Sequence, residues 1–395
     1  MKIEIYSPTI RRKEMDSVLT AMVEEKIGPG ERNRLLIQTA KEQLHFDYAL
    51  ALRSPAVALF TALKALSSVN LQNSPQGNTN GGVQGSPESG QDNSAEGQAA
   101  SKAAVISALS PRYYLQVLQD LNITPLYCDV SFDFPCMSRE LIENTIAKKP
   151  QGLEVCAIVL HHTLGFTPDA ASIAELGIPV IEDISQSYGS WLKPINKKDK
   201  QEDAPSPSTG KSEKEETGVK FSGIFCILGL EERDMLTSGG GALLFAMNRK
   251  EGMLLRNFAG LADEYFMPDI NSALAIVQFK ELHRNITRRH EIAEVFIQAS
   301  LRTRHKRFIP INDGEYCNYA FSLVLETGLK DVTAYARKKE IEIENAFENT
   351  IAGSVHCDNC PVSSSLVMRT VLFPMYPRLR SQDVERVSRL IMTLP

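Results

Sequence analysis

The first residues that could do chemistry form a short polar loop between two apolar segments. Residues 224–230 read I-F-C-I-L-G-L, then come Glu231, Glu232 and Arg233, and a glycine turn at 239–241 leads into another apolar run. A carboxylate cannot form a Schiff base, and a guanidinium stays protonated and is a poor nucleophile. These three residues of the loop therefore offer no amine for covalent catalysis.

Further polar residues follow another short apolar segment. Asp183 and Ser187 come after residues 180–182, just as the Glu231 loop comes after residues 224–230. Both segments read as strands, and ligands of mostly parallel sheets bind at the carboxyl ends of the strands. The sequence therefore predicts a ligand site near these residues.

Histidine and cysteine patterns predict no metal site. Cys357 and Cys360 form a C-x-x-C beside His356, which is half a zinc site at best because no matching pair lies downstream. His283 and His290 are seven residues apart and lack the i, i+4 spacing of a helical metal pair. We interpret the cysteine pair as a loop feature.

Two other clusters have ordinary structural interpretations. The basic run 302–307 is typical of a solvated helix end, although nucleic-acid binding is the alternative. The glycines at 239–241 are too few to form a nucleotide-phosphate loop and favour a tight entry into a strand. Neither cluster predicts a function.

Composition indicates an ordinary globular protein. The chain has 395 residues, 43% of them hydrophobic and 23% charged, and its net charge of −5 gives no reason to expect a nucleic-acid partner. No run approaches 18 apolar residues and the first residues lack the apolar core of a secretory signal, so we expect no membrane segment. The seven scattered cysteines are typical of reduced thiols in a cytoplasmic protein.

The pattern of elements predicts an α/β fold. Strands are expected at 103–108, 124–129, 157–161 and 180–182, and helices at 112–121, 138–147 and 169–176. Short β-branched runs alternating with helices indicate a mostly parallel sheet covered on both faces. We expect a large α/β domain at 1–270 and a smaller α+β domain at 271–395, which begins with a long helix.

Two polar tracts interrupt the large domain. Residues 71–101 are rich in Gly, Asn, Gln and Ser, and residues 193–217 mix Lys, Glu, Asp, Ser and Pro. Such segments cannot bury enough apolar area to order themselves. We expect both tracts to be surface insertions.

Six segments, in the same order, resemble motifs of the DegT/DnrJ/StrS family of sugar aminotransferases. These are fold-type-I enzymes that use pyridoxal phosphate on nucleotide-linked keto-sugars. The segments are A-L-R-S-P-A-V-A-L-F-T-A-L (51–63), T-P-L-Y-C-D-V (124–130), A-I-V-L-H-H-T-L-G-F-T-P-D (157–169), V-I-E-D-I-S-Q-S-Y-G-S (180–190), M-P-D-I-N-S-A-L-A-I-V-Q-F-K-E-L (267–282) and L-F-P-M-Y-P-R-L-R-S-Q-D-V-E-R-V (372–387). The resemblance spans nearly the whole chain apart from the polar tracts.

One half of the family's cofactor signature is retained. The resemblance implies that Asp183 pairs with the protonated pyridine nitrogen, that Gln186 lies by the ring and that His162 lies near the pocket. Asp183 could instead cap the turn after its strand, and His162 could be a packed strand-end residue.

The phosphate half is missing. In the family, a Gly-Thr pair at a helix start holds the phosphate. Here the pair is Pro55-Ala56, in which the proline has no N–H to donate and the alanine has no hydroxyl. A family serine aligns with Cys226, and a family asparagine from across the dimer interface aligns with Glu264. Like charges about 4 Å apart repel by roughly 4 kcal/mol at an effective dielectric near 20, so Glu264 would oppose a phosphate.

The Schiff-base lysine is missing as well. Counting forward from Phe225 places its position at Glu231, and counting back from the glycine turn places it at Arg233. Lys220 precedes the strand, at the wrong end for the pocket. Some family members use a histidine here for dehydration, and the loop contains no histidine either.

These substitutions predict a family homologue that is non-catalytic or altered. Pyridoxal phosphate is its cofactor by resemblance only, with no covalent bond expected. We expect a homodimer that binds a nucleotide-sugar or a catalytic paralogue in saccharide biosynthesis. The alternatives are an active transaminase whose motifs are misaligned here, and a pure scaffold that presents the polar tracts.

Overall fold

A computed structural model describes residues 2–72, 101–192, 221–311, 316–357 and 359–395. The two predicted polar insertions, 71–101 and 193–217, lie outside the described residues except at positions 71, 72 and 101.

A seven-stranded sheet forms the centre of the large domain, in the order β1-β7-β6-β5-β4-β2-β3. Its strands are β1 (Tyr48–Leu52), β2 (Ser101–Ser107), β3 (Thr124–Cys128), β4 (Leu153–His161), β5 (Val180–Asp183), β6 (Phe225–Gly229) and β7 (Ala242–Ala246). The five strands from β3 to β6 in this order are parallel to their neighbours, and β7 is antiparallel to both β6 and β1. The predicted mostly parallel sheet is confirmed.

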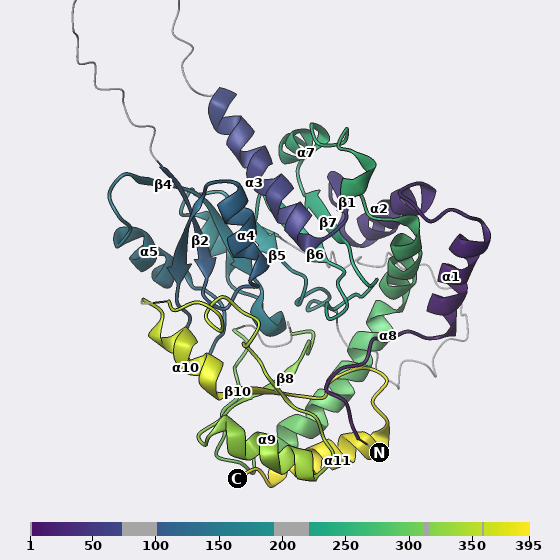
Figure 1. The fold of residues 1–395 in the computed structure, drawn as a ribbon, viewed down its shortest axis with the longest axis vertical. Coiled ribbons are helices and arrows are strands. Elements are labelled where there is room, and N and C mark those ends of the chain that lie inside the picture. Colours follow the sequence, from purple (N-terminus) through teal and green to yellow (C-terminus); the bar gives the residue numbers. More distant parts are fainter. Residues whose placement is uncertain (1, 73–100, 193–220, 312–315, 358) are drawn as a thin grey trace, which may run out of the picture.

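Helices cover both faces of this sheet (Figure 1). One face packs against α3 (Pro55–Gln72) and α4 (Tyr113–Asp120), and α7 (Arg249–Arg256) adds to that side. The other face packs against α2 (Glu31–Leu44), α5 (Arg139–Ala147), α6 (Ala170–Ala174) and the first half of α8 (Asp269–Ser300). The predicted three layers are therefore present.

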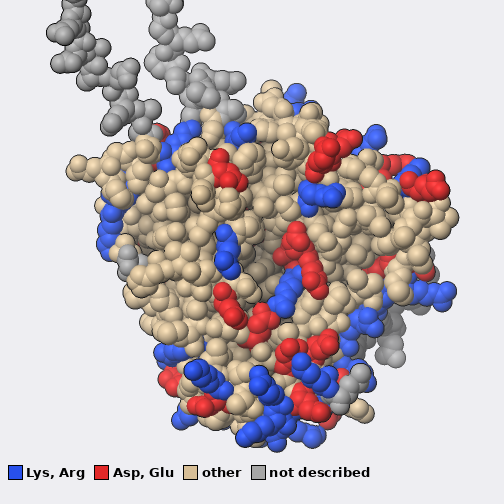
Figure 2. Space-filling model, viewed as in Figure 1, with Lys and Arg blue, Asp and Glu red and all other residues tan. Residues whose placement is uncertain are grey.

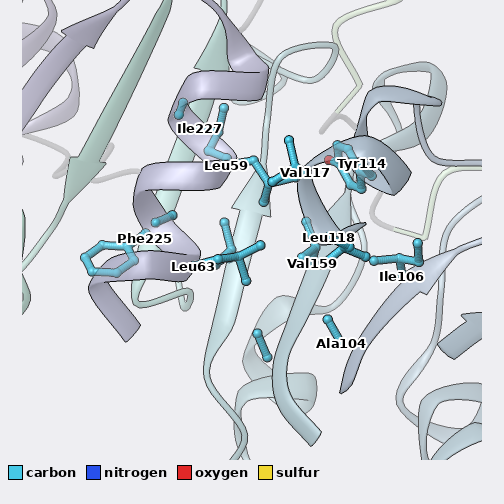
Figure 3. Close-up of a cluster of buried hydrophobic side chains, with 14 of the residues drawn as sticks. Leu59, Leu63, Ala104, Ile106, Tyr114, Val117, Leu118, Val159, Phe225 and Ile227 are labelled. Atoms are coloured by element: carbon cyan, nitrogen blue, oxygen red, sulfur yellow. The ribbon is translucent and has the colours of Figure 1, made fainter. Parts of the chain in front are cut away.

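A close-packed apolar cluster joins α3 and α4 to the sheet (Figure 3). Leu59 and Leu63 of α3 face Ile227 and Phe225 of β6, and Val117 of α4 lies between the two helices. All five are at most 5% exposed. The alternation along β6 places Phe225 and Ile227 on this face, so Gly229, two residues further, lies on it too.

Helix starts follow from local sequence. Ser54 accepts a hydrogen bond from the Val57 N–H at 3.3 Å, and Pro55 occupies the first turn of α3. α7 and the later helix α10 (Pro361–Arg369) were not predicted. α7 contains many charged residues. α10 follows directly on the C-x-x-C loop, so the sequence gives no clear signal for its first residue.

The small domain has a three-stranded antiparallel sheet in the order β8-β10-β9. Its elements are β8 (Phe321–Val324), α9 (Leu329–Lys338), β9 (Glu344–Asn345), β10 (Thr370–Phe373), α11 (Ser381–Met392) and the second half of α8. The predicted boundary at 270 falls two residues inside α8. Ile3 forms a bridge to Ile341, so the N-terminal residues also pack here, and Figure 1 shows both termini at this end.

In the described parts of the chain, none of the helices is both long enough and apolar enough to cross a lipid bilayer.

Candidate functional site

The parallel strands point their carboxyl ends toward the small domain. β4, β5 and β6 end at His161, Asp183 and Gly229, and the loops after them lie between the large sheet and the small one. Figure 2 shows a hollow near the middle of this face, with acidic and basic side chains along its rim. The strand ends and this hollow lie in the same part of the view, between the large and the small domain.

Asp183 is the most strongly held polar group of this region. Its Oδ2 accepts hydrogen bonds from the hydroxyls of Tyr114 at 2.6 Å and Tyr113 at 3.2 Å. Its Oδ1 accepts the backbone N–H of Ser185 at 3.1 Å and also the Ser185 hydroxyl. His161 Nδ1 lies 3.5 Å from Oδ2. Both oxygens thus have protein donors, and the bond from Ser185 shows that Asp183 also caps the turn after β5.

The donors decide the ionisation of Asp183. Burial alone would raise the pKa of this carboxyl, which is 1% exposed. The interactions with His161, Ser185 and Tyr114 outweigh burial and hold its pKa well below the ordinary value. Burial and the Asp183 charge conversely raise the pKa of the Tyr113 and Tyr114 hydroxyls, which remain protonated donors.

The two histidines at the end of β4 lie on opposite faces of the sheet. His161 shares the face of Asp183, and His162 lies on the face of Glu182, 3.5 Å from its Oε2. His162 Nδ1 also contacts the Ser187 hydroxyl at 2.7 Å. The histidine beside the carboxylate is therefore His161, while His162, singled out from the sequence, is packed behind the strand end.

Gln186 ties two strand-end loops together. Its Oε1 accepts the backbone N–H of Leu164 at 2.7 Å, at a residue with a left-handed backbone conformation (φ 54°). Ser190, in the same turn, donates to the Ser187 carbonyl. These hydrogen bonds hold the loop in place, and they explain the orientation of the Gln186 side chain without a bound cofactor.

Contacts of Glu232 and Arg233 tie the loop after β6 to the rest of the protein. Arg233 Nη1 contacts both carboxylate oxygens of Glu344 in β9 at 2.7 Å, and the Arg233 carbonyl accepts from the Tyr319 hydroxyl at 2.8 Å. The Glu232 carbonyl accepts from the Tyr6 hydroxyl. The residues counted to the lysine position therefore join the large sheet to the small sheet and the N-terminal segment.

Asp234 is a site residue that the sequence reasoning missed. Its Oδ2 accepts the Glu231 N–H at 2.8 Å. A Cβ atom built on Gly229 would lie 2.4 Å from Asp234 Oδ2, 2.7 Å from the Ser185 hydroxyl and 3.1 Å from Pro55 Cγ. These three groups therefore converge on one point, so Asp234 brings a carboxylate to the first turn of α3.

The pKa of Asp234 is unusual. Burial is the largest cause that raises the pKa of this carboxyl to about 7, and the negative charges of Asp183 and Glu231 act in the same direction. The hydrogen bond from the Glu231 N–H acts in the opposite direction. Two carboxyl groups with opposite pKa shifts therefore share this site: Asp183 is ionised, and Asp234 titrates near neutral pH.

The degenerate phosphate-site positions are not all together. Pro55 and Ala56 begin α3, beside Asp234. Glu264 is exposed in the short turn η3 (Asp263–Tyr265), whose last residue accepts the Arg53 N–H at 2.8 Å, so it lies near the same helix start. Cys226 pairs with Glu182 in the sheet register and packs on the opposite face from Asp183.

The cysteine pair is part of the protein core. Cys357 and Cys360 are 3% and 0% exposed, and Cys360 directly precedes α10. Within the described ranges, no group of three or more His, Cys, Asp or Glu side chains could hold a metal ion.

Tyr113 and Tyr114 could have been suspected from the sequence, since two tyrosines opening a buried helix need hydroxyl partners. Their hydrogen-bond partner could not be identified from the sequence, because Asp183 lies 69 residues from Tyr114 in the chain. Asp234 lies next to the loop already singled out, where only an amine was sought. Its role depends on Gly229, which leaves room for its carboxylate.

Solved structures of the same fold cover almost all of this chain. The aminotransferase TlmJ from Streptoalloteichus hindustanus has a TM-score of 0.74 and 16% identity over 99% of this chain and 98% of its own. Helicobacter pylori PseC, an aminotransferase involved in the biosynthesis of pseudoaminic acid, has a TM-score of 0.75 and 12% identity at the same coverage. The GDP-4-keto-6-deoxy-D-mannose-3-dehydratase of E. coli, with bound hydrated PLP, has a TM-score of 0.72 and 13% identity over 99% of each chain. The fold is therefore that of the fold-type-I aminotransferases.

The C-terminal part of the sequence matches a known family. Residues 244–392 match the model of the DegT/DnrJ/EryC1/StrS aminotransferase family. The match begins inside β7 and ends with α11. The resemblance read from the sequence is thus confirmed, while Asp183, Asp234 and the loop after β6 lie outside the matched segment.

Proposed function

We propose that this chain is a divergent family member that does not act as a pyridoxal-phosphate transaminase. In this proposal it keeps the fold of sugar aminotransferases and serves nucleotide-sugar or polysaccharide biosynthesis by binding a sugar nucleotide or a catalytic paralogue. The support comes from the site after β5 and β6, where the protein's own groups take the places that a cofactor would need.

The observation that carries the proposal is the hydrogen bonding of Asp183. A pyridinium nitrogen would have to donate to this carboxylate, which already accepts from Tyr113, Tyr114 and Ser185. A cofactor could bind there only by displacing buried hydroxyls, each of which would lose a charge-assisted hydrogen bond.

The phosphate end presents a second obstacle. The start of α3 lacks one N–H because of Pro55 and faces the carboxylate of Asp234. A helix start attracts anions, and here the chain supplies its own. Pyridoxal phosphate therefore does not fit the described residues well at either end.

No amine stands in the loop to hold the cofactor covalently. Glu231 is half-buried, and Arg233 points to Glu344. The described partners of Asp183 are two tyrosines, Ser185 and His161, with no lysine among them. We therefore expect no Schiff base at this site.

The working transaminase remains the second candidate because Asp183 itself is retained and ionised. A low pKa is what a partner of a pyridinium nitrogen requires. An active family member of this kind would transfer an amino group to a nucleotide-linked keto-sugar.

Spectroscopy of the purified chain distinguishes the two. We expect a colourless protein that stays colourless after incubation with pyridoxal phosphate and gel filtration, with no added mass after borohydride treatment. A visible absorbance band that borohydride abolishes, leaving one modified lysine, would overturn the proposal.

Binding and assembly are tested on the same preparation. We propose a cytoplasmic homodimer, which sedimentation can measure. Titration with UDP-N-acetylglucosamine and GDP-mannose tests the ligand class, and co-purification with an active family member from the same cell tests the partner. If neither sugar nucleotide nor family member binds, a scaffold that presents the polar tracts becomes the better account.

A further inference from the structure

A second hollow lies at the outer edge of the large sheet, beside β3. Its volume is about 400 Å³, within the range of small-molecule sites. The edge strand β3, the C-terminal end of α5 and the start of α10 surround it. Figure 1 shows α5 and α10 on the same side of the molecule.

This hollow is separate from the Asp183 site. In the sheet order, β3 is three strands away from β5. Neighbouring strands lie roughly 4.8 Å apart, so the two sites are separated by about 14 Å of packed sheet. Occupation of one therefore does not require the other.

The inner side of the hollow is apolar. Leu126 and Tyr127 of β3 and Leu141 of α5 line it, together with Pro361. Leu126 is buried, and Tyr127 is partly buried and lines the hollow. This surface suits a planar or apolar group, since aromatic and aliphatic side chains stack on such groups.

The outer side is basic. Lys148 and Lys149 both line the hollow, and neither forms an ion pair with a carboxylate among the described residues. Asn144, Thr145 and Asn359 add polar side chains. Unpaired lysines beside amide and hydroxyl donors are the groups that hold a phosphate.

Among the described residues that line the hollow, Asp129 is the one acidic residue, and it is already engaged. Asp129 accepts hydrogen bonds from the N–H groups of Val362 at 3.0 Å and Ser363 at 2.8 Å, and from the Ser363 hydroxyl at 2.6 Å. It therefore serves as a cap of the first turn of α10.

The charges of the described lining residues add up to a net positive value. The two lysines contribute +2 and Asp129 contributes −1. The carboxyl end of α5 and the amino end of α10 carry about half a charge each, of opposite sign, and cancel. A net charge of about +1 remains to attract an anion.

We propose that this hollow is a binding site for a small organic phosphate, with the phosphate on Lys148 and Lys149 and the attached ring on Tyr127. The volume admits a mononucleotide-sized molecule, and the apolar and basic sides correspond to its two parts. The site is independent of the proposed function of the Asp183 site.

Calorimetric titration of the full chain with AMP and, separately, with inorganic phosphate tests the proposal. We expect AMP to bind more tightly than phosphate, and both to bind more weakly as NaCl is added. The double variant Lys148→Gln/Lys149→Gln should weaken both by roughly tenfold or more. Tyr127→Leu should weaken AMP and leave phosphate unchanged.

The matched control is Lys338→Gln/Lys339→Gln, a second lysine pair at the end of a helix, α9. It should bind both probes as the unaltered chain does. Absence of binding of both probes, or equal losses in the two double variants, would overturn the proposal. Equal affinities for AMP and phosphate would show that the ring attached to the phosphate does not contribute to binding.

Discussion

The hydroxyl of Tyr114 lies 2.6 Å from the carboxylate of Asp183, and both groups are at most 1% exposed. A helix of the α3 and α4 layer thus reaches over the end of β5 and closes off the carboxylate. The contact makes Asp183 part of the protein core.

Replacing Tyr114 by phenylalanine should destabilise the protein by about 1.5–3 kcal/mol, because a buried ionised carboxylate loses a donor. The free energy of unfolding in urea measures this. Tyr188→Phe is the matched control, since Tyr188 is equally buried and donates to the neutral Gln43 at 3.0 Å. It should cost about 1 kcal/mol. Equal losses would mean that Asp183 is not charged.

Asp234 should make stability depend on pH. Its pKa is raised from 3.8 to about 7 in the folded protein, so the folded state binds the proton more tightly than the unfolded state. The free energy of unfolding should therefore fall as the pH rises from about 4 to about 7, and level off above. Asp234→Asn should flatten this fall and stabilise the protein more at pH 8 than at pH 5.

Two neighbouring carboxyl groups, those of Asp183 and Glu231, also affect how the stability depends on pH. Asp183 has a lowered pKa, so its contribution is present above 3.8 and constant between pH 5 and 8. Burial raises the pKa of Glu231, which has the same sign as Asp234, so Glu231→Gln should be measured alongside. An unchanged pH slope in Asp234→Asn would show that Asp234 is solvated.

Gly229 should tolerate no side chain. Alanine there would place Cβ 2.4 Å from Asp234 Oδ2 and 2.7 Å from the Ser185 hydroxyl, so we expect a loss of about 1–3 kcal/mol in thermal or urea unfolding. Gly28→Ala, with no atom within 4 Å, is the control and should change stability little. Were Gly229→Ala as mild as the control, the convergence of Asp234, Ser185 and Pro55 would be disproved.

The contact between Arg233 and Glu344 should couple the loop after β6 to the small sheet. A double-mutant cycle with Arg233→Gln and Glu344→Gln should give a coupling of about 0.5–1 kcal/mol that shrinks at high salt. The more exposed pair Arg139–Glu175 should give less, because its glutamate side chain is 70% exposed against 22% for Glu344. A coupling no larger than that of the control pair would show that the loop is free.

Much of the architecture followed from local pattern. Alternation of short β-branched runs with helices predicted the parallel strands. α7 was missed because its two buried residues, Gly252 and Leu255, give no apolar stripe to read. The bridge of Ile3 to Ile341 could not be read either, since nothing local links residues so far apart.

The sequence predicted only those site residues that lie within a recognisable motif. Asp183 was identified because a family motif surrounds it, but its hydroxyl partners come from a helix that the motif does not include. Which face a strand-end side chain takes depends on register, and this separates His161 from His162 and Cys226 from Asp183. Whether pyridoxal phosphate binds stays a prediction for the spectrum to decide.

The pairing of Ile3 with the segment around Ile341 has a consequence for how the protein is made. The Ile3 N–H donates to the Glu340 carbonyl at 2.8 Å and the Ile3 carbonyl accepts from Glu342 at 2.9 Å. Ribosomes add about 5–20 residues per second, so the first strand-like residues wait roughly 15–70 seconds for their partner to emerge. During translation Ile3 therefore stays without this partner until residues 340–342 have been made.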